Sequence, residues 1–119
     1  MSKQKFPFSP EEDVEIWRFT MEDHPGYGRN SMWNLFIKRT GSRRPQVSLN
    51  VRFRDYLLPH LPFTSFHTET KLKFCVQYKI QVDQAFLEAL EEDAYVILDD
   101  DGFVTAYTMK PSAGRNIDQ

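Results

Sequence analysis

Residues 29–54 read RNSMWNLFIKRTGSRRPQVSLNVRFR, and this stretch decides the fold of the N-terminal half. Two segments with apolar residues at helical spacing flank a break at Thr40-Gly41-Ser42, which is the layout of a helix-turn-helix. The stretch holds seven of the fifteen basic residues and no Asp or Glu, although the chain has a formal net charge of −2. Because nucleic-acid binding responds to local charge, this stretch predicts a basic recognition surface.

An acidic helix is expected before this stretch, beginning at Pro10 and ended by His24-Pro25-Gly26. Ser9 is the expected N-cap, and Glu12 completes a capping box. The expected buried stripe consists of Val14, Ile16, Trp17, Thr20 and Met21. The acidic residues expected to face outward, and to repel a polyanion, are Glu11, Glu12, Asp13 and Glu15.

A second helix is predicted to start near Asn30 or Ser31 and to run to Arg39, with Gly41 at the C′ position. Its expected core residues are Trp33, Phe36 and Ile37, with Met32 and Leu35 partly inside.

A third helix is predicted to begin at Pro45, as its first helical residue, and to stop before Pro59. The expected inward residues are Leu49, Phe53 and either Tyr56 or Leu57. The expected outward stripe, which follows Arg43 and Arg44 in the turn, consists of Gln46, Val47, Asn50, Val51 and Arg54. Arg52 is expected to pack over the first helix and to pair with Glu12 or Asp13.

The outward face of the third helix has the chemistry of a major-groove reader. Arginine suits guanine edges, Asn or Gln suits adenine, Val suits the thymine methyl group, and flanking cations suit phosphates. The candidate nucleic-acid-binding residues are Lys38, Arg39, Arg43, Arg44, Gln46, Val47, Asn50 and Arg54. The alternative is a basic helix face that is solvated or that docks an acidic protein partner.

The C-terminal half is expected to begin with a strand, because apolar residues alternate strictly from Leu72 to Val82. A helix beginning at Thr68 or Thr70 is the alternative. A helix capped by Asp83 should follow, with Phe86, Leu87 and Leu90 inside and Glu88, Glu91, Glu92 and Asp93 outside. The runs 94–98 and 103–108, joined through Asp99-Asp100-Asp101-Gly102, predict a β-hairpin.

No catalytic residue, metal site or cofactor is expected. His24, His60 and His67 lie in three separate linkers without ligand spacing. Residues 99–101 fit turn chemistry better than a calcium loop. Cys75 is the single cysteine, lies in an apolar run and is predicted to be a buried, inert thiol. No run is apolar enough to span a bilayer, and no signal-peptide core is visible in MSKQKFPFSPEED.

Two family resemblances follow from these motifs. FSPEEDVEIWRF, GRNSMWNLFIKRT and SLNVRFRDYLLPHL together resemble the Myb/SANT domain of Rap1-type telomere proteins. A second resemblance spans nearly the whole chain: TGSRR, VRFRDYLLP, TKLKF, VDQAFLEAL and DAYVILDDDGFVTAY resemble the SPK domain. That family is expanded in nematodes and is named for its association with SET proteins, PHD-finger proteins and protein kinases. The resemblance implies a nuclear, chromatin-related setting and one domain that includes both halves.

The sequence therefore predicts an α+β domain, with a Myb/SANT-like three-helix bundle followed by a strand or helix, a helix and a C-terminal β-hairpin. The expected organisation is an arm at 1–7, one domain at 8–109 with parts at 8–60 and 63–109, and a tail at 110–119. The expected function is a non-catalytic nuclear module that contacts DNA through the third helix. The alternative is a protein-interaction module that docks an acidic partner or self-associates. No membrane or small-molecule substrate is expected.

Overall fold

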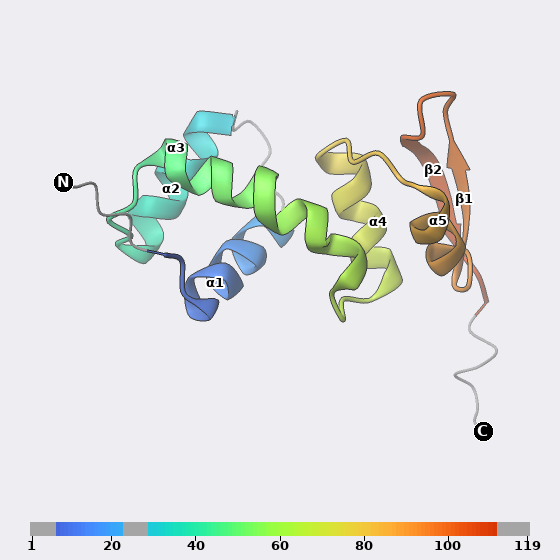
Figure 1. Cartoon of the computed structure of the whole chain (residues 1–119), viewed down its shortest axis with the longest axis horizontal. Coiled ribbons are helices and arrows are strands. Elements are labelled where there is room, and N and C mark those ends of the chain that lie inside the picture. The colour runs from blue at the N-terminus through green and yellow to red at the C-terminus, as the bar shows by residue number, and fades with distance from the viewer. Residues whose placement is uncertain (1–6, 23–28, 112–119) are drawn as a thin grey trace, which may run out of the picture. The chain divides into compact units, whose positions relative to one another are not determined.

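The computed structural model describes residues 7–22 and 29–111. The chain divides into two compact units, Met1–His60 and Leu61–Gln119, called here the N-terminal and C-terminal units. Within the described residues there are α-helices in both units and a two-stranded antiparallel sheet in the C-terminal unit, which confirms the α+β class (Figure 1). The expectations for residues 1–6, for His24-Pro25-Gly26 and for 112–119 lie outside the described residues.

Helix α1 runs from Pro10 to Met21, and its capping box is confirmed. The Glu12 backbone N–H donates to Ser9 Oγ at 3.1 Å, and the Ser9 N–H donates to Glu12 Oε1 at 3.0 Å. The predicted buried stripe was wrong in part: the buried residues are Ile16, Phe19 and Thr20, whereas Val14 and Met21 are exposed. Positions 16, 19 and 20 also share one helix face, and they bury a large aromatic ring that the predicted stripe left outside.

Helix α2 runs from Arg29 to Thr40, slightly longer than predicted at both ends. Trp33 and Phe36 are buried as predicted. Met32 is buried as well, whereas Ile37, predicted for the core, is only partly buried, as is Leu35. Gly41 confirms its predicted C′ role, because its φ is +72° and its N–H donates to the carbonyl oxygen of Ile37 at 2.9 Å.

The third helical segment begins as α3 (Gln46–Val51) and continues as a π-helical turn, η1 (Arg52–Leu57). Residues 46–57 are called helix three below. Pro45 is the N-cap residue and not the first helical residue. Helical structure also continues past the predicted stop, as the 3₁₀ segment η2 (Leu58–Phe63). Pro59 lacks an N–H and clashes with an α-helical carbonyl, so the chain passes it in a tighter helix type.

An aromatic cluster fills the interior of the N-terminal unit. The Trp33 ring is fully buried, and its centroid lies 6.1 Å from Phe19, 5.7 Å from Phe36 and 5.7 Å from Phe53. Trp17 contacts Phe53 edge-on at 6.1 Å. From helix three, Leu49, Phe53 and Leu57 point inward, and Tyr56 stays partly exposed. This cluster fixes which face of helix three remains outside.

The C-terminal unit begins with a helix where a strand was predicted. Helix α4 runs from Thr68 to Gln77, so the strand over 72–82 was wrong and the alternative was right. Cys75 explains the result, because it is buried at helical spacing from Leu72, whereas Val76, in the apolar register of the expected strand, is exposed. Lys79, two residues after the end of α4, has a positive φ of 54°. The Ile80 N–H donates to the carbonyl oxygen of Cys75 at 3.1 Å.

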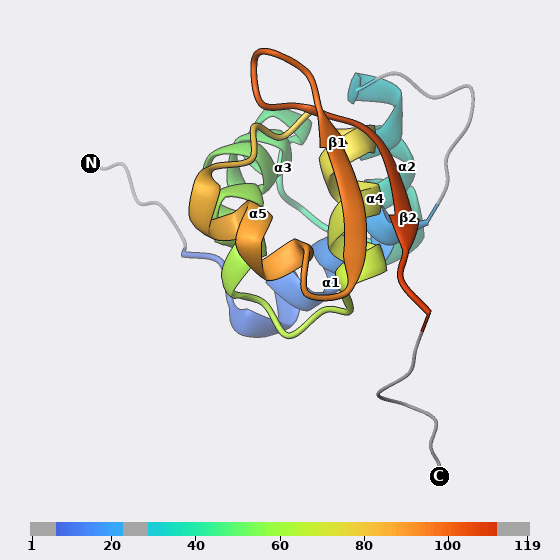
Figure 2. The same cartoon turned by 90° about the vertical axis from the view of Figure 1, so that its right-hand side faces the viewer.

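The remaining elements confirm the predictions. Asp83 caps helix α5 (Gln84–Leu90), with its Oδ1 accepting from the N–H of Phe86 at 2.8 Å. Strands β1 (Ala94–Leu98) and β2 (Val104–Met109) pair antiparallel, with a register irregularity between Ile97 and Leu98. Helix α4 contacts β2, and α5 contacts β1 (Figure 2). At the tip, Asp99 Oδ1 accepts from the N–H groups of Asp101 and Phe103, and the φ of Gly102 is +90°.

Candidate binding groove on helix three

One of the predicted phosphate-binding arginines, Arg44, is engaged by an acidic residue of α1. Arg44 Nε and Nη2 each donate to the Glu12 carboxylate at 2.8 Å, and Nη2 also donates to the Pro7 carbonyl oxygen at 3.0 Å. These charged hydrogen bonds lower the pKa of Glu12 from its ordinary value of 4.5 to about 2. Glu12 is therefore bound by a cation of its own chain, and the prediction that it faces outward to repel a polyanion was wrong.

Arg52, which lies on helix three eight residues after Arg44, makes a similar arrangement. Its Nε and Nη2 donate to the two oxygens of Asp13 at 3.0 and 2.7 Å, which confirms one of the two predicted pairings. Its guanidinium carbon also lies 3.6 Å from the centroid of the Tyr56 ring. The Phe8 ring lies close to both arginines, 3.9 Å from the Arg44 guanidinium carbon and 5.1 Å from that of Arg52. The result is a contiguous array of aromatic rings and guanidinium groups.

The two amide side chains expected to read adenine are not free at the surface. Asn50 Oδ1 accepts a hydrogen bond of 3.1 Å from the indole N–H of the buried Trp33. The Oε1 atom of Gln46 is buried and accepts no hydrogen bond from the part of the chain that the structure describes. Only partial exposure remains at both residues, so the prediction that they belong to one outward stripe with Val47 was wrong. The indole N–H needs an acceptor in the core, and Asn50 supplies it.

The other candidate residues remain at the surface. Lys38 and Arg43 are exposed, and Arg54 is partly exposed. Among the described residues, none of these three cations forms an ion pair. Arg39 pairs with Glu22 at 2.8 Å, but both side chains are about half exposed, so solvent screens this pair.

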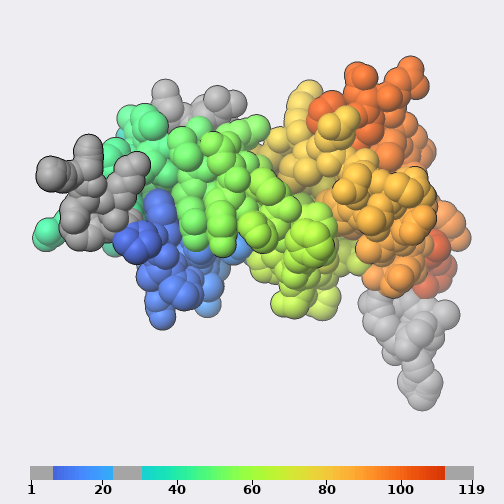
Figure 3. Space-filling view, viewed as in Figure 1, coloured from blue at the N-terminus to red at the C-terminus, as the bar shows by residue number. Residues whose placement is uncertain are grey.

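A groove of about 830 Å³ runs along helix three, beside the segment that leads into α1. Its lining residues are Pro7, Phe8, Arg44, Pro45, Val47, Ser48, Val51, Arg52, Asp55 and Tyr56. The helix-three members recur at intervals of three and four residues, so they form one stripe along the helix. Helix three, in green, is open to view in the space-filling representation (Figure 3).

The floor of this groove is unusually apolar for a surface between two arginines. The exposed fraction is 70% for Val47, 48% for Val51 and 45% for Tyr56. Three large exposed side chains along one stripe form a contiguous patch, which is more informative than isolated exposed apolar residues. Such a stripe suits an apolar partner surface, in the way that an amphipathic segment fills a groove.

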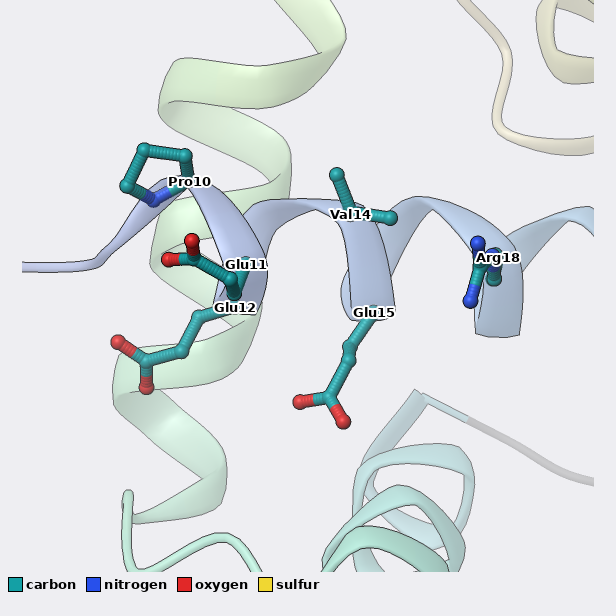
Figure 4. A pocket seen from close by; sticks show the side chains of 6 residues that line it. All are labelled: Pro10, Glu11, Glu12, Val14, Glu15 and Arg18. Carbon is teal, nitrogen blue, oxygen red and sulfur yellow. The ribbon is translucent and has the colours of Figure 1, made fainter.

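A second depression, of about 440 Å³, lies on α1. All six lining side chains, from Pro10 to Arg18, come from this one helix (Figure 4). No other element supplies a facing wall to it, so a ligand would be held from one side only. Glu12 at its edge is already bound to Arg44. This depression therefore offers less than the groove on helix three.

The described residues contain no group of three His, Cys, Asp or Glu side chains that could hold a metal ion. Cys75 is buried as predicted, and desolvation raises the pKa of its thiol to about 12. No described helix combines the length and apolar character needed to cross a membrane.

Sequence reasoning missed part of the groove. Phe8 precedes the N-cap of α1 and belongs to no periodic pattern, so nothing marked it as a wall. Tyr56 was weighed only as a core residue. The signal that was available is the excess of acidic residues at the start of α1, which matches the excess of cations in and after the turn at 40–45.

The geometry defines a small α+β fold with a groove along helix three. The family model of SPK, described as a domain of unknown function (DUF545), matches residues 24–113. The chain therefore belongs to the SPK family. Helix α1, which supplies Glu12 and Asp13, precedes the matched region. No curated protein compared with the chain matches it significantly.

Proposed function

We propose that this chain is a non-catalytic protein-interaction module that binds its partner in the groove along helix three. The observation that carries the proposal is the exposed apolar stripe of Val47, Val51 and Tyr56. Burying these side chains against a partner is favourable by about 25 cal/mol for each Å² of apolar surface removed from water. A phosphate backbone offers no comparable apolar surface.

The state of the arginines supports the same proposal. Arg44 and Arg52 each direct two donors toward an acid of α1, so binding a phosphate with those donors would require breaking a bidentate pair. Asn50, the best candidate for reading a base, accepts from Trp33 instead. Base recognition by this helix would therefore disrupt the core that positions it.

DNA binding remains the second candidate, and one observation favours it. Lys38, Arg43 and Arg54 are cations at the surface without ion pairs among the described residues. They suit contacts to phosphates, which position a protein on a duplex without reading its sequence. With either function we propose a nuclear location, which rests on the resemblance to chromatin-associated proteins.

The groove is tested with two valines of matched exposure. Val51 lies in the groove and is 48% exposed, whereas Val14 lies on α1 and is 47% exposed. Proteins captured by the wild-type chain from nuclear extract are purified and titrated against the wild type, Val51→Gln and Val14→Gln. We expect a partner whose affinity falls at least tenfold with Val51→Gln and less than twofold with Val14→Gln.

Two results would overturn the proposal. One is a partner affinity that responds equally to the two valine substitutions. The other is duplex DNA binding that is tighter than any protein binding and is lost in Val51→Gln but kept in Val14→Gln, because the groove would then belong to a nucleic-acid surface. Circular dichroism of each variant shows that the helices are retained.

A further inference from the structure

We infer that the partner that fits the helix-three groove is the β-hairpin of a second copy of this chain, so that copies associate head to tail. This inference rests on the proposed function, because it names an occupant for the same groove. It is carried by a second apolar surface, on the C-terminal unit, whose chemistry complements the groove.

The outer face of the hairpin is apolar and open. Tyr95 and Ile97 are each 60% exposed, and they lie on the same face of β1 because they are two residues apart. Their cross-strand neighbours on β2 are Thr108 and Ala106, which are also exposed. One charged side chain lies at the edge of this face: the Nζ atom of Lys110 is 5.2 Å from the Tyr95 ring centroid.

Acidic residues flank this face at both ends. Glu91, Glu92 and Asp93 are exposed immediately before β1, and Asp99, Asp100 and Asp101 are exposed after it. Positive charge predominates beside the groove, because Arg43 precedes its apolar stripe and Arg54 lies next to it on helix three. These two arginines form no ion pair among the described residues, and Asp55 is the acidic residue that lines the groove. The acids at the two ends of the hairpin face thus complement the cations beside the apolar stripe, which favours the pairing of these two surfaces.

The two surfaces also have similar lengths. The stripe from Val47 to Tyr56 extends about 14 Å at the rise of a helix. Strand β1, measured in the same way from Ala94 to Leu98, extends about 14 Å at the rise of a strand. The patches differ from each other, so the contact is heterologous and each copy keeps one free groove and one free hairpin face.

A complementation experiment tests this arrangement with neutral substitutions. The groove variant is Val47→Gln/Val51→Gln, and the hairpin variant is Tyr95→Gln/Ile97→Gln. Sedimentation velocity of the full chain is measured from about 5 to about 500 μM, a range that covers weak association. We expect the mass of the wild type to rise with concentration and each double variant to stay monomeric. An equimolar mixture of the two variants should form 1:1 dimers and grow no further, because it contains one intact groove and one intact hairpin face.

The control is Val14→Gln, which should associate like the wild type. Association should weaken when salt is raised from about 50 to about 500 mM, because the flanking charges are exposed. A wild type that stays monomeric at every concentration would overturn the inference. So would association that survives either double variant, or a mixture that does not form dimers. If the wild type is monomeric but another protein binds in a Val51-dependent manner, the inference fails and the proposed function stands.

Discussion

Arg44 and Glu12 are joined by two hydrogen bonds of 2.8 Å across 32 residues of sequence. The same carboxylate accepts the N–H of Ser9 within the capping box. Glu12 therefore both closes the first turn of α1 and holds the start of helix three. A bidentate pair of this kind has a narrow geometry, so it fixes the wall of the groove as well as its charge.

The Glu12–Arg44 pair predicts a defined dependence of stability on pH. The pKa of Glu12 is lowered from 4.5 to about 2 in the folded chain. A lowered pKa means that the stabilisation is fully present above the unfolded value near 4.5 and is lost as the pH falls toward 2. Glu12→Gln keeps an acceptor for the capping box but loses the charge. We expect this variant to be less stable by about 1 kcal/mol at pH 7, a figure reduced for partial exposure.

Urea denaturation at pH 7, 4.5, 3 and 2 measures this difference. The gap between the wild type and Glu12→Gln should be constant down to about pH 4.5 and should close near pH 2. Glu11→Gln serves as the control, because Glu11 lies on the same turn and forms no ion pair among the described residues. Its difference in stability from the wild type should not disappear between pH 4.5 and pH 2. A gap that persists unchanged at pH 2 would contradict the pairing.

The Trp33–Asn50 hydrogen bond predicts that Asn50 is a stability residue. Asn50→Ala leaves the buried indole N–H without its acceptor, which costs about 1–3 kcal/mol. Asn34→Ala, at an exposed position of α2, is the matched substitution and should change stability by less than about 0.5 kcal/mol. Equilibrium urea unfolding followed by tryptophan fluorescence checks both values. Equal stabilities for the two variants would rule out this role.

Because Arg44 is paired with Glu12 and Arg52 with Asp13, we predict a shallow salt dependence for DNA binding. With the cations of the end of α2, the turn and helix three all available (Lys38, Arg39, Arg43, Arg44, Arg52 and Arg54), about six phosphate contacts would give a log–log slope near −5. With Lys38, Arg43 and Arg54 alone, three contacts give a slope of about −3. Fluorescence anisotropy of a generic duplex at several salt concentrations measures the slope. Arg43→Glu should lower the affinity for the duplex below that of the wild type, whereas Arg18→Glu, on α1, should change this affinity much less.

Cys75 should be protected from thiol reagents in the folded chain. Its pKa is raised to about 12 by burial, so the reactive thiolate is scarce at pH 8, and its side chain is almost fully buried. We expect labelling by a chromogenic disulfide reagent to be slower than in urea by at least a hundredfold. Its rate should rise with denaturant in parallel with unfolding. Immediate labelling of the folded chain would mean that α4 opens readily.

Elements with their own local signals could be predicted from the sequence. Ser9 and Glu12 spell out a capping box, and the Asp-Gly turn at Asp101-Gly102 specifies the hairpin tip. Arg52 was predicted to pair with Glu12 or Asp13, because opposite charges lay on helices expected to pack together, and it pairs with Asp13. In each case the determining contacts lie within a few residues or follow from a simple charge pattern.

What could not be predicted depends on contacts between distant residues. In the segment 72–82, apolar residues fit both the two-residue period of a strand and the 3.6-residue period of a helix. The burial of both Leu72 and Cys75, three residues apart, distinguishes the helix from the strand. On helix three, Asn50 was predicted to face outward because it belongs to no inward apolar stripe. The buried N–H of Trp33, 17 residues earlier, turns it inward. The groove wall at Phe8 depends on two arginines more than 35 residues away.

Lys79 shows that selection has not brought this chain to its greatest possible stability. It occupies the left-handed position after α4, with a φ of 54°, where a residue with a Cβ costs about 1 kcal/mol relative to glycine. We expect Lys79→Gly to raise the free energy of unfolding by up to about 1 kcal/mol, and Lys73→Gly, inside the same helix, to lower it by a similar amount. The same change, from lysine to glycine, would thus raise stability at one position and lower it six residues away. Urea unfolding of both variants measures the two free energies. The lysine side chain marks a place where the domain can be strengthened without touching the groove or the hairpin face.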